Sequence, residues 1–212
     1  MLTKAEVRSL LADVENPVLF EIGVGFPEDT VEFISTFNDK DFELFCFEPD
    51  PRNIEFFKKT VNDFRVTLVP KAVGNIDGIV EFNLSPGETR LSGSLREPAK
   101  ALYDIWPQIF GNMKFPKTKV ECVKLDTFCK DMDVVDFIWM DVQSAEDLVI
   151  DGGLNTLTNK TKYLYTEYGN AEIYKNGYTL KKILTLLPDY DIIKDYGTGG
   201  AEGDILLKNR RL

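Results

Sequence analysis

Four acidic residues of this sequence stand at the ends of short apolar runs, where their carboxylates could act as ligands or bases. They are Glu21, Glu48, Asp141 and Glu167. In an open α/β sheet, ligands lie beyond the carboxyl ends of the parallel strands, so acids at these ends meet at one edge. The 212-residue chain contains no histidine, which leaves Asp, Glu, Lys, Tyr or Cys as a general base. We therefore expect the four carboxylates to form one functional site.

The first of these acids belongs to a glycine motif that is typical of a cofactor site. Residues 20–25 read Phe-Glu-Ile-Gly-Val-Gly, and Gly23 and Gly25 would let the backbone turn tightly and approach a ligand. Glu48, after the next apolar run, would accept hydrogen bonds from two ribose hydroxyls. The combination predicts a nucleotide-type cofactor.

Two features distinguish between the cofactors of this class. The third glycine of the dinucleotide fingerprint is missing, and Glu28 and Asp29 on the first turn of the next helix would repel a pyrophosphate. The same two acids are also ordinary residues for a helix N-terminus. Glu21 suits a cationic group such as the sulfonium or amino group of S-adenosylmethionine. The motif therefore favours this cofactor, and a methyltransferase, over a nicotinamide-dependent dehydrogenase.

Strands and helices alternate along the chain, and this alternation would place the acids at one edge. Predicted strands cover residues 18–24, 42–48, 65–70, 134–141, 163–167, 191–194 and 204–208, and predicted helices cover residues 3–13, 29–37, 145–150 and 178–187, with another starting at Pro51. The pattern predicts an α/β, Rossmann-like, doubly wound fold with a mostly parallel seven-stranded sheet and an antiparallel edge strand. The last two strands predict a closing antiparallel hairpin. Asp77-Gly78 predicts another hairpin turn, into a strand over residues 79–84.

Residues 85–119 lack this regularity and are rich in proline and glycine. A connection this long inside a compact domain is usually functional or disordered, and its aromatic residues argue against disorder. We expect a single domain over residues 1–212 in which residues 85–119 form a lid or a substrate-binding insertion. Tyr103 and Trp106 would suit stacking on a sugar ring, and core packing explains them equally well.

Composition limits the partners and the compartment. The formal net charge of -10 and the lack of a Lys/Arg run argue against nucleic acid as a partner. Cys46, Cys122 and Cys129 lack the spacing of metal ligands and fit a reducing compartment. The sequence shows neither a signal peptide nor an apolar run of membrane-spanning length. We expect a cytoplasmic protein without a membrane partner, and the oligomeric state stays open.

Taken together, these motifs resemble the FkbM family of S-adenosylmethionine-dependent O-methyltransferases from residue 18 to residue 167. Four blocks carry the resemblance: residues 20–25; residues 46–51; residues 69–74 with 77–78 and 92–95; and residues 123–128 with 138–146. The last is the most specific, because residues 141–146 are similar to the family's Asp-Val-Gln-Gly-Ala-Glu. Two departures are Phe26-Pro27, where the family continues its glycine motif, and Ser144, where the family has glycine.

The resemblance implies a role for each matching position. On the cofactor side, the methionine part would be held by Glu21, Gly23 and Gly25, the ribose by Glu48, and the adenine by Lys71 and Ala72. Asp141 would stand where the methyl group meets the acceptor. The matching positions on the acceptor side are Gln143, Glu146 and Ser94. Apart from the resemblance, we expect Tyr168 and the insertion residues Tyr103 and Trp106 on the same side. The acceptors that the family implies are sugars of glycans or glycosylated metabolites.

A sugar hydroxyl is a poor nucleophile, so its attack on a sulfonium methyl needs alignment and a base. Asp141 is the first candidate for that base and Glu167 the second. Alternatively, Asp141, Glu146 and Glu167 would bind a divalent cation that acidifies the hydroxyl, and an all-carboxylate site suits Mg²⁺ or Mn²⁺. Two rival functions are a nicotinamide-dependent oxidoreductase and a non-catalytic nucleoside-binding domain on a similar fold.

Overall fold

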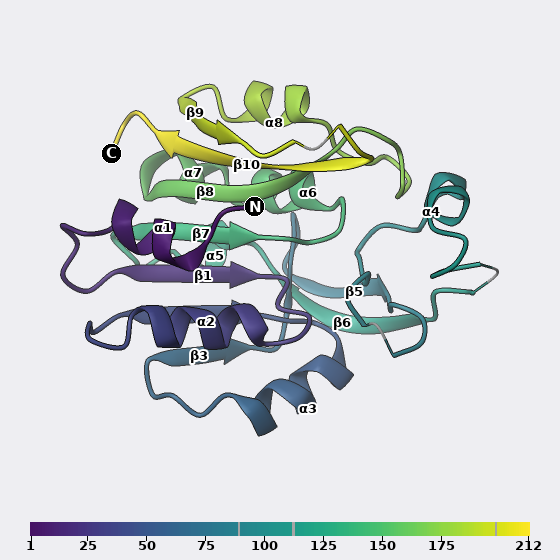
Figure 1. Cartoon of the computed structure of the whole chain (residues 1–212), viewed down its shortest axis with the longest axis horizontal. Helices are drawn as coiled ribbons and strands as arrows, with labels where there is room; N and C mark the ends of the chain where they lie inside the picture. The colour runs from purple at the N-terminus through teal and green to yellow at the C-terminus, as the bar shows by residue number, and fades with distance from the viewer. Residues whose placement is uncertain (89, 112, 198) are drawn as a thin grey trace.

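The computed structural model describes residues 1–88, 90–111, 113–197 and 199–212, and its centre is a seven-stranded sheet (Figure 1). The strands lie in the order β3-β2-β1-β7-β8-β10-β9. Their bounds are β1 Val18–Ile22, β2 Glu43–Phe47, β3 Val66–Val69, β7 Val135–Met140, β8 Thr161–Gly169, β9 Tyr190–Asp195 and β10 Glu202–Asn209. All pairs from β3 to β8 are parallel, whereas β10 runs antiparallel to both β8 and the edge strand β9. The structure confirms the predicted doubly wound sheet and its closing antiparallel hairpin.

The strand order reverses at β1, and this reversal determines where a ligand can bind. From β1 the chain builds outward through β2 and β3, and it later places β7 and β8 on the other side of β1. In doubly wound sheets, the crevice beyond the carboxyl ends of the strands at such a reversal holds the ligand. Ile22 pairs with both Phe47 and Met140, so β1, β2 and β7 end at the same level. The segments that follow these strands therefore meet at the crevice.

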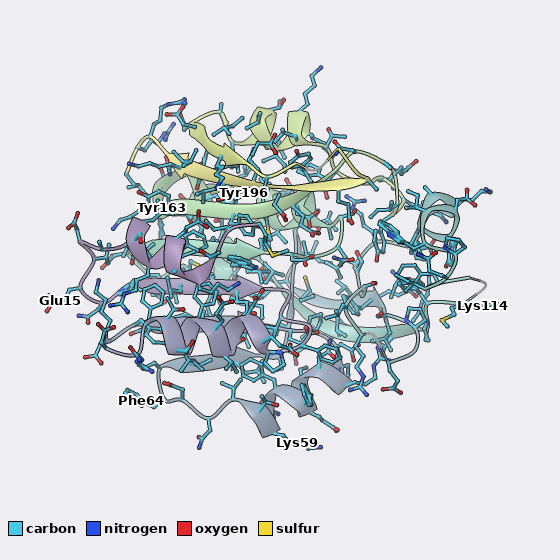
Figure 2. The ribbon with its side chains drawn as sticks, in the orientation of Figure 1. Glu15, Lys59, Phe64, Lys114, Tyr163 and Tyr196 are labelled. Carbon is cyan, nitrogen blue, oxygen red and sulfur yellow. The ribbon has the colours of Figure 1, made fainter. Side chains whose placement is uncertain are left out.

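Helices cover both faces of the sheet (Figure 1). Their bounds are α1 Lys4–Leu10, α2 Glu28–Thr36 and α3 Pro51–Thr60 on one face, and α5 Leu125–Phe128, α6 Glu146–Gly152, α7 Leu154–Asn159 and α8 Leu180–Leu186 on the other. Side chains alternate along the strands, so Phe137 packs in the core under α1 and α2, whereas its neighbour Ile138 packs under α5 to α8. Tyr163 and Tyr196, labelled in Figure 2, are partly buried and pack against the core on the α1 side of the sheet.

Local sequence explains where α3 begins, which positions one wall of the crevice. Pro51 stands at the first helical position, where its missing N–H costs no hydrogen bond. The Asp50 carboxylate caps the helix by accepting a 2.9 Å hydrogen bond from the Arg52 backbone N–H. The predicted start of this helix at Pro51 is confirmed.

A second, three-stranded sheet lies beside the main one and corrects one prediction. Its strands, β4 Ala72–Val73, β5 Gly78–Asn83 and β6 Lys117–Val123, pair in the order β4-β6-β5. The hairpin predicted at Asp77-Gly78 is wrong, because β6 lies between β4 and β5. Asp77 instead accepts hydrogen bonds from the Lys124 backbone N–H and the Thr127 hydroxyl, at 2.9 and 2.8 Å. These bonds hold the turn against the start of α5.

The insertion of residues 85–119 carries the helix α4 Lys100–Ile105 and leads into β6. Leu102, Phe110 and Phe115 pack on Ile173 and Tyr174, which follow β8, and together they form a small core. Figure 1 shows α4 at the end of the molecule toward which the arrows of β1 and β7 point. The insertion therefore stands over the crevice edge of the sheet. None of the described helices is long and apolar enough to cross a membrane.

Candidate functional site

A cavity of about 230 Å³ lies in the crevice beyond β1, β2 and β7. Its walls are the segments that follow these strands, the start of β4, and residues 90–93 and 95 of the insertion. The predicted site residues that line it are Gly23, Gly25, Glu48, Lys71, Ala72, Asp141 and Gln143. The structure therefore brings residues from all four sequence blocks to one cavity.

Gly23 lines this cavity at a position where a side chain has no room unless the backbone shifts. Its φ angle is +90°, and a Cβ atom built on it would lie 1.8 Å from the backbone oxygen of Asp141. The close approach follows from two hydrogen bonds, from the Asp141 N–H to the Ile22 carbonyl (2.9 Å) and from the Gly23 N–H to the Phe47 carbonyl (3.0 Å). The glycine thus allows the ends of three strands to converge.

Glu48 is held rigidly at the end of β2 by two backbone donors. Its side chain is buried, and its two carboxylate oxygens accept hydrogen bonds from the N–H groups of Gly25 and Asp50, both at 2.7 Å. Each oxygen keeps a second lone pair for a ligand, so the carboxylate can accept two further hydroxyls. Burial raises the pKa of Glu48 to about 8.

Glu21 has a different location from the one that the resemblance implies. It is not among the described residues that line the cavity. Its buried carboxylate accepts hydrogen bonds from the Thr30 hydroxyl at 2.5 Å and from the Cys46 thiol at 3.4 Å. Burial raises the pKa of Glu21 to about 7. The side chain ties the first turns of α2 to β1 and β2, and so supports the glycine loop from the face covered by α2.

Three carboxylates, those of Asp141, Glu146 and Glu167, bring oxygen atoms within 4.8 Å of one another. Burial raises the pKa of Glu146 to about 8. Burial and the adjacent Asp141 charge raise the pKa of Glu167 well above its usual range. Burial also raises the pKa of Asp141, but hydrogen bonds from Gln143 (2.8 Å) and Glu167 oppose this effect. Because two adjacent carboxyls resist ionising together, we infer that the pair shares one proton, held mainly by Glu167, whose pKa is raised well above its usual range.

The turn after Asp141 has an uncommon backbone that the insertion holds in place. Gln143 and Ser144 have φ angles of 55° and 65°, in the left-handed region that side chains disfavour. The Ser94 hydroxyl donates a 2.8 Å hydrogen bond to the Gln143 carbonyl. The Tyr174 hydroxyl donates to the Ser92 carbonyl at 2.8 Å and lies 3.5 Å from the Gln143 amide oxygen. Ser94 therefore contacts the turn that carries Asp141 and is not among the described residues that line the cavity.

Three aromatic residues predicted on the acceptor side lie away from the cavity. Tyr103 and Trp106 pack against the small core around Phe115, and the rings of Tyr103 and Phe115 are 6.5 Å apart. Tyr168 is buried, and its hydroxyl donates a 2.8 Å hydrogen bond to Asp195. These contacts are those of packing residues.

Some residues of the cavity wall have no motif in the sequence: Asn53, Phe82, Arg90 and Leu91. The helical period after Pro51 could have indicated Asn53, because Asn53 lies four residues before Phe57 and both are on the buried side of α3. Arg90 and Leu91 belong to the irregular insertion, where neither period nor spacing indicates which residues face a ligand.

Comparison with known proteins places this site in a family. The Methyltransferase FkbM domain matches residues 18–197 of the chain, which include all four strand-end carboxylates. The chain belongs to the FkbM methyltransferase family. It is 36% identical over 211 residues to the 2-O-methyltransferase NoeI of Sinorhizobium fredii (strain NBRC 101917 / NGR234), covering 95% of this chain and 83% of that protein.

Solved methyltransferase structures share the fold. The methyltransferase FkbM from Methylobacillus flagellatus KT has a TM-score of 0.55 at 16% identity; the match covers 92% of this chain and 44% of that one, so this chain spans less than half of its length. The magnesium protoporphyrin IX methyltransferase of Synechocystis PCC 6803, whose structure contains S-adenosylmethionine, has a TM-score of 0.50 at 8% identity, covering 97% and 76%. At these identities the likeness shows the fold alone.

Proposed function

We propose that this protein is an S-adenosylmethionine-dependent O-methyltransferase that methylates a hydroxyl group of a sugar. The observation that carries the proposal is the position of Asp141: it lines the same cavity as Glu48 and stands beside a second, half-buried carboxyl, Glu167. A cofactor site and a proton acceptor thus lie side by side. The hydroxyl acceptor is supported by the relative named a 2-O-methyltransferase, and its sugar nature by the family resemblance.

The cavity suits the cofactor in two respects. The missing side chain at Gly23 leaves room that a Cβ atom would fill, and Glu48 presents two free acceptor positions that match a ribose diol. Gly23 and Gly25 would hold the methionine part, Glu48 the ribose, and Lys71 with Ala72 the adenine. When bound, S-adenosylmethionine supplies an electrophilic methyl group on a positively charged sulfur.

Asp141 would act as the general base. Its carboxylate carries the charge of the Asp141–Glu167 pair, and the hydrogen bond from the Gln143 amide orients it toward the cavity. The acceptor hydroxyl would give its proton to Asp141 while its oxygen takes up the methyl group, and S-adenosylhomocysteine would remain as the leaving group. A positioned base of this kind contributes about 10²–10⁴-fold to the rate.

The same carboxylates also satisfy the donor requirements of a divalent cation. Asp141, Glu146 and Glu167 offer three oxygens within 4.8 Å, and one Glu167 oxygen is buried without a hydrogen-bond partner among the described residues. Mg²⁺ and Mn²⁺ prefer such oxygen ligands and would acidify the acceptor hydroxyl. Chelation distinguishes the two mechanisms: EDTA abolishes turnover, and Mg²⁺ or Mn²⁺ restores it, only if the cation takes part.

Calorimetric titration and a methyl-transfer assay test the proposal. We expect micromolar binding of S-adenosylmethionine and S-adenosylhomocysteine, no binding of NAD, and transfer of labelled methyl groups to members of a glycoside panel. Asp141→Asn should lower turnover about 10²–10⁴-fold and change the affinity for S-adenosylhomocysteine less than threefold. Asp133→Asn is the control, because Asp133 is exposed and lies just before β7, the strand that Asp141 follows.

Four outcomes would contradict parts of this proposal. Failure of the wild type to bind either sulfur compound would remove the cofactor assignment, and binding of NAD would favour the oxidoreductase. Cofactor binding without transfer to any glycoside would favour the non-catalytic nucleoside-binding alternative or another acceptor class. Full turnover by Asp141→Asn would exclude Asp141 as the base.

A further inference from the structure

The charges on the cavity wall are unevenly distributed. Glu48, Asp50 and Asp141 are acidic, and among the described residues that line the cavity only Lys71 and Arg90 are cationic. Lys71 lies next to the start of β4, and its amino group forms a 2.9 Å ion pair with Glu121. Of these two cations, Arg90 is the one beside the glycine loop, because its neighbour Leu91 lies against Gly25.

The usual alternative, the N-terminus of the helix after the glycine loop, is unfavourable for an anion here. Glu28 and Asp29 occupy the first turn of α2 and oppose the positive end of its dipole. Lys4, on α1, is buried and forms a 2.7 Å ion pair with Asp29 of this turn. Neither the α2 N-terminus nor Lys4 therefore offers uncompensated positive charge to a ligand.

The main chain of Arg90 is held next to the glycine loop. Its φ angle is 51°, and its carbonyl accepts a 3.1 Å hydrogen bond from the Asn53 amide. The adjacent Leu91 lies against Gly25, where an added Cβ would be 2.8 Å from the Leu91 side chain. A non-glycine residue in the left-handed region stores backbone strain, which is found most often at functional sites.

The guanidinium of Arg90 is only partly satisfied. Its Nε atom is buried and has no hydrogen-bond partner among the described residues. Its Nη2 atom contacts Glu88 at 2.9 Å, but the Glu88 side chain is 92% exposed. Such an exposed ion pair contributes little and exchanges readily. A buried donor without an acceptor has a high desolvation cost, which a ligand anion would remove.

We propose that Arg90 binds the α-carboxylate of the methionine part of the cofactor. This inference rests on the proposed function, because the carboxylate is the one anionic group of S-adenosylmethionine. The planar guanidinium can donate two parallel hydrogen bonds to a carboxylate, and this geometry gives specificity as well as affinity. Arg90 would then make the cavity selective for the complete amino acid over nucleosides that lack it.

The test compares two ligands that differ in this group. S-adenosylhomocysteine carries the carboxylate, whereas 5′-methylthioadenosine keeps the adenosine and sulfur and lacks the amino acid. Calorimetry would be done with both ligands on the wild type, Arg90→Met and Arg90→Lys. Lys71→Met, which removes the other cation of the wall, is the matched control.

We expect Arg90→Met to lose at least tenfold in affinity for S-adenosylhomocysteine and less than twofold for 5′-methylthioadenosine. Arg90→Lys should lie between Arg90→Met and the wild type, and Lys71→Met should leave the ratio of the two affinities unchanged. Binding of 5′-methylthioadenosine shows that each variant is folded.

The assignment would be overturned by an unchanged affinity of Arg90→Met for S-adenosylhomocysteine, or by an equal loss of affinity for both ligands. A selective loss in Lys71→Met would assign the carboxylate to Lys71 and overturn it as well. If the proposed function itself is wrong, the wild type will bind neither ligand, and this outcome is distinguishable from the results above. The assignment of Arg90 would then fail as well.

Discussion

Replacing Glu48 by Gln isolates the charge at the end of β2 with almost no change in shape. In the wild type the two Glu48 oxygens accept hydrogen bonds from the N–H groups of Gly25 and Asp50. A glutamine has one oxygen and one NH₂ group, so its NH₂ must face one of these two donors. The variant therefore loses one backbone hydrogen bond and one of the two acceptor positions offered to the ribose.

The expected losses in stability and in ligand affinity follow from these contacts. A buried donor left without an acceptor costs about 1–3 kcal/mol, which we expect as a loss in the free energy of unfolding of Glu48→Gln. Loss of a hydrogen bond to a charged acceptor costs about 1.5–3 kcal/mol, which corresponds to a roughly ten- to hundredfold weaker Kd for S-adenosylhomocysteine.

The pH dependence gives a sharper test. With a pKa of about 8, Glu48 is mostly protonated at pH 7 in the free protein, and the ionised form accepts both ribose hydroxyls. Affinity should therefore increase as the pH rises toward 8 and level off above it, by roughly tenfold per pH unit below 8. Near pH 7, binding should release close to one proton, since the bound form is ionised.

Calorimetry from pH 6 to pH 9, in buffers of different ionisation enthalpy, measures both the Kd and the number of protons released. The Kd of Glu48→Gln should not depend on pH in this way. Glu43→Gln, an exposed change at the start of β2, should keep the pH dependence of the wild type. A wild-type Kd that varies less than threefold between pH 6 and pH 8.5, or a wild-type slope in Glu48→Gln, would refute the reasoning.

Two further predictions concern backbone conformation, and thermal unfolding tests both. Gly23→Ala should lower the free energy of unfolding by about 2–5 kcal/mol, because its φ of +90° costs about 1–2 kcal/mol and the contact with the Asp141 backbone costs about 1–3 kcal/mol. The control Gly87→Ala, at φ +67° with no atom within 4 Å, should show only the conformational cost. Equal losses in the two variants would contradict the close approach at Gly23. Ser144→Gly should raise stability by roughly 0.5–1 kcal/mol, since relief of the strain at φ 65° exceeds the added entropy of the unfolded chain. A lower melting temperature for Ser144→Gly would show that the hydroxymethyl group contributes more than the strain costs.

The main sheet and much of the cavity could be predicted because their signals are local. Strand periodicity, glycine positions and the acids that end apolar runs depend on neighbouring residues, and the parallel topology then brings those ends to one edge. Glu48 and Asp141 were located in this way, although β2 and β7 are far apart in the sequence.

The orientation of Glu21 was decided by tertiary packing. The motif places an acid before the glycines, but its carboxylate accepts hydrogen bonds from Thr30 and Cys46 under α2. Which face of β1 a side chain occupies depends on the elements that cover that face, and the motif carries no information about them.

The amino-acid sequence by itself determined the order of strands and helices, the glycine loop and the strand-end carboxylates, because each arises from the chemistry of adjacent residues. Only the tertiary structure decided that β6 inserts between β4 and β5, that Tyr103 and Trp106 pack beside Tyr174, and that Arg90 reaches the cavity. These arrangements depend on contacts between segments that are distant in the chain. Many pairings of such segments satisfy the local patterns equally well, and the packing of the complete core selects one of them.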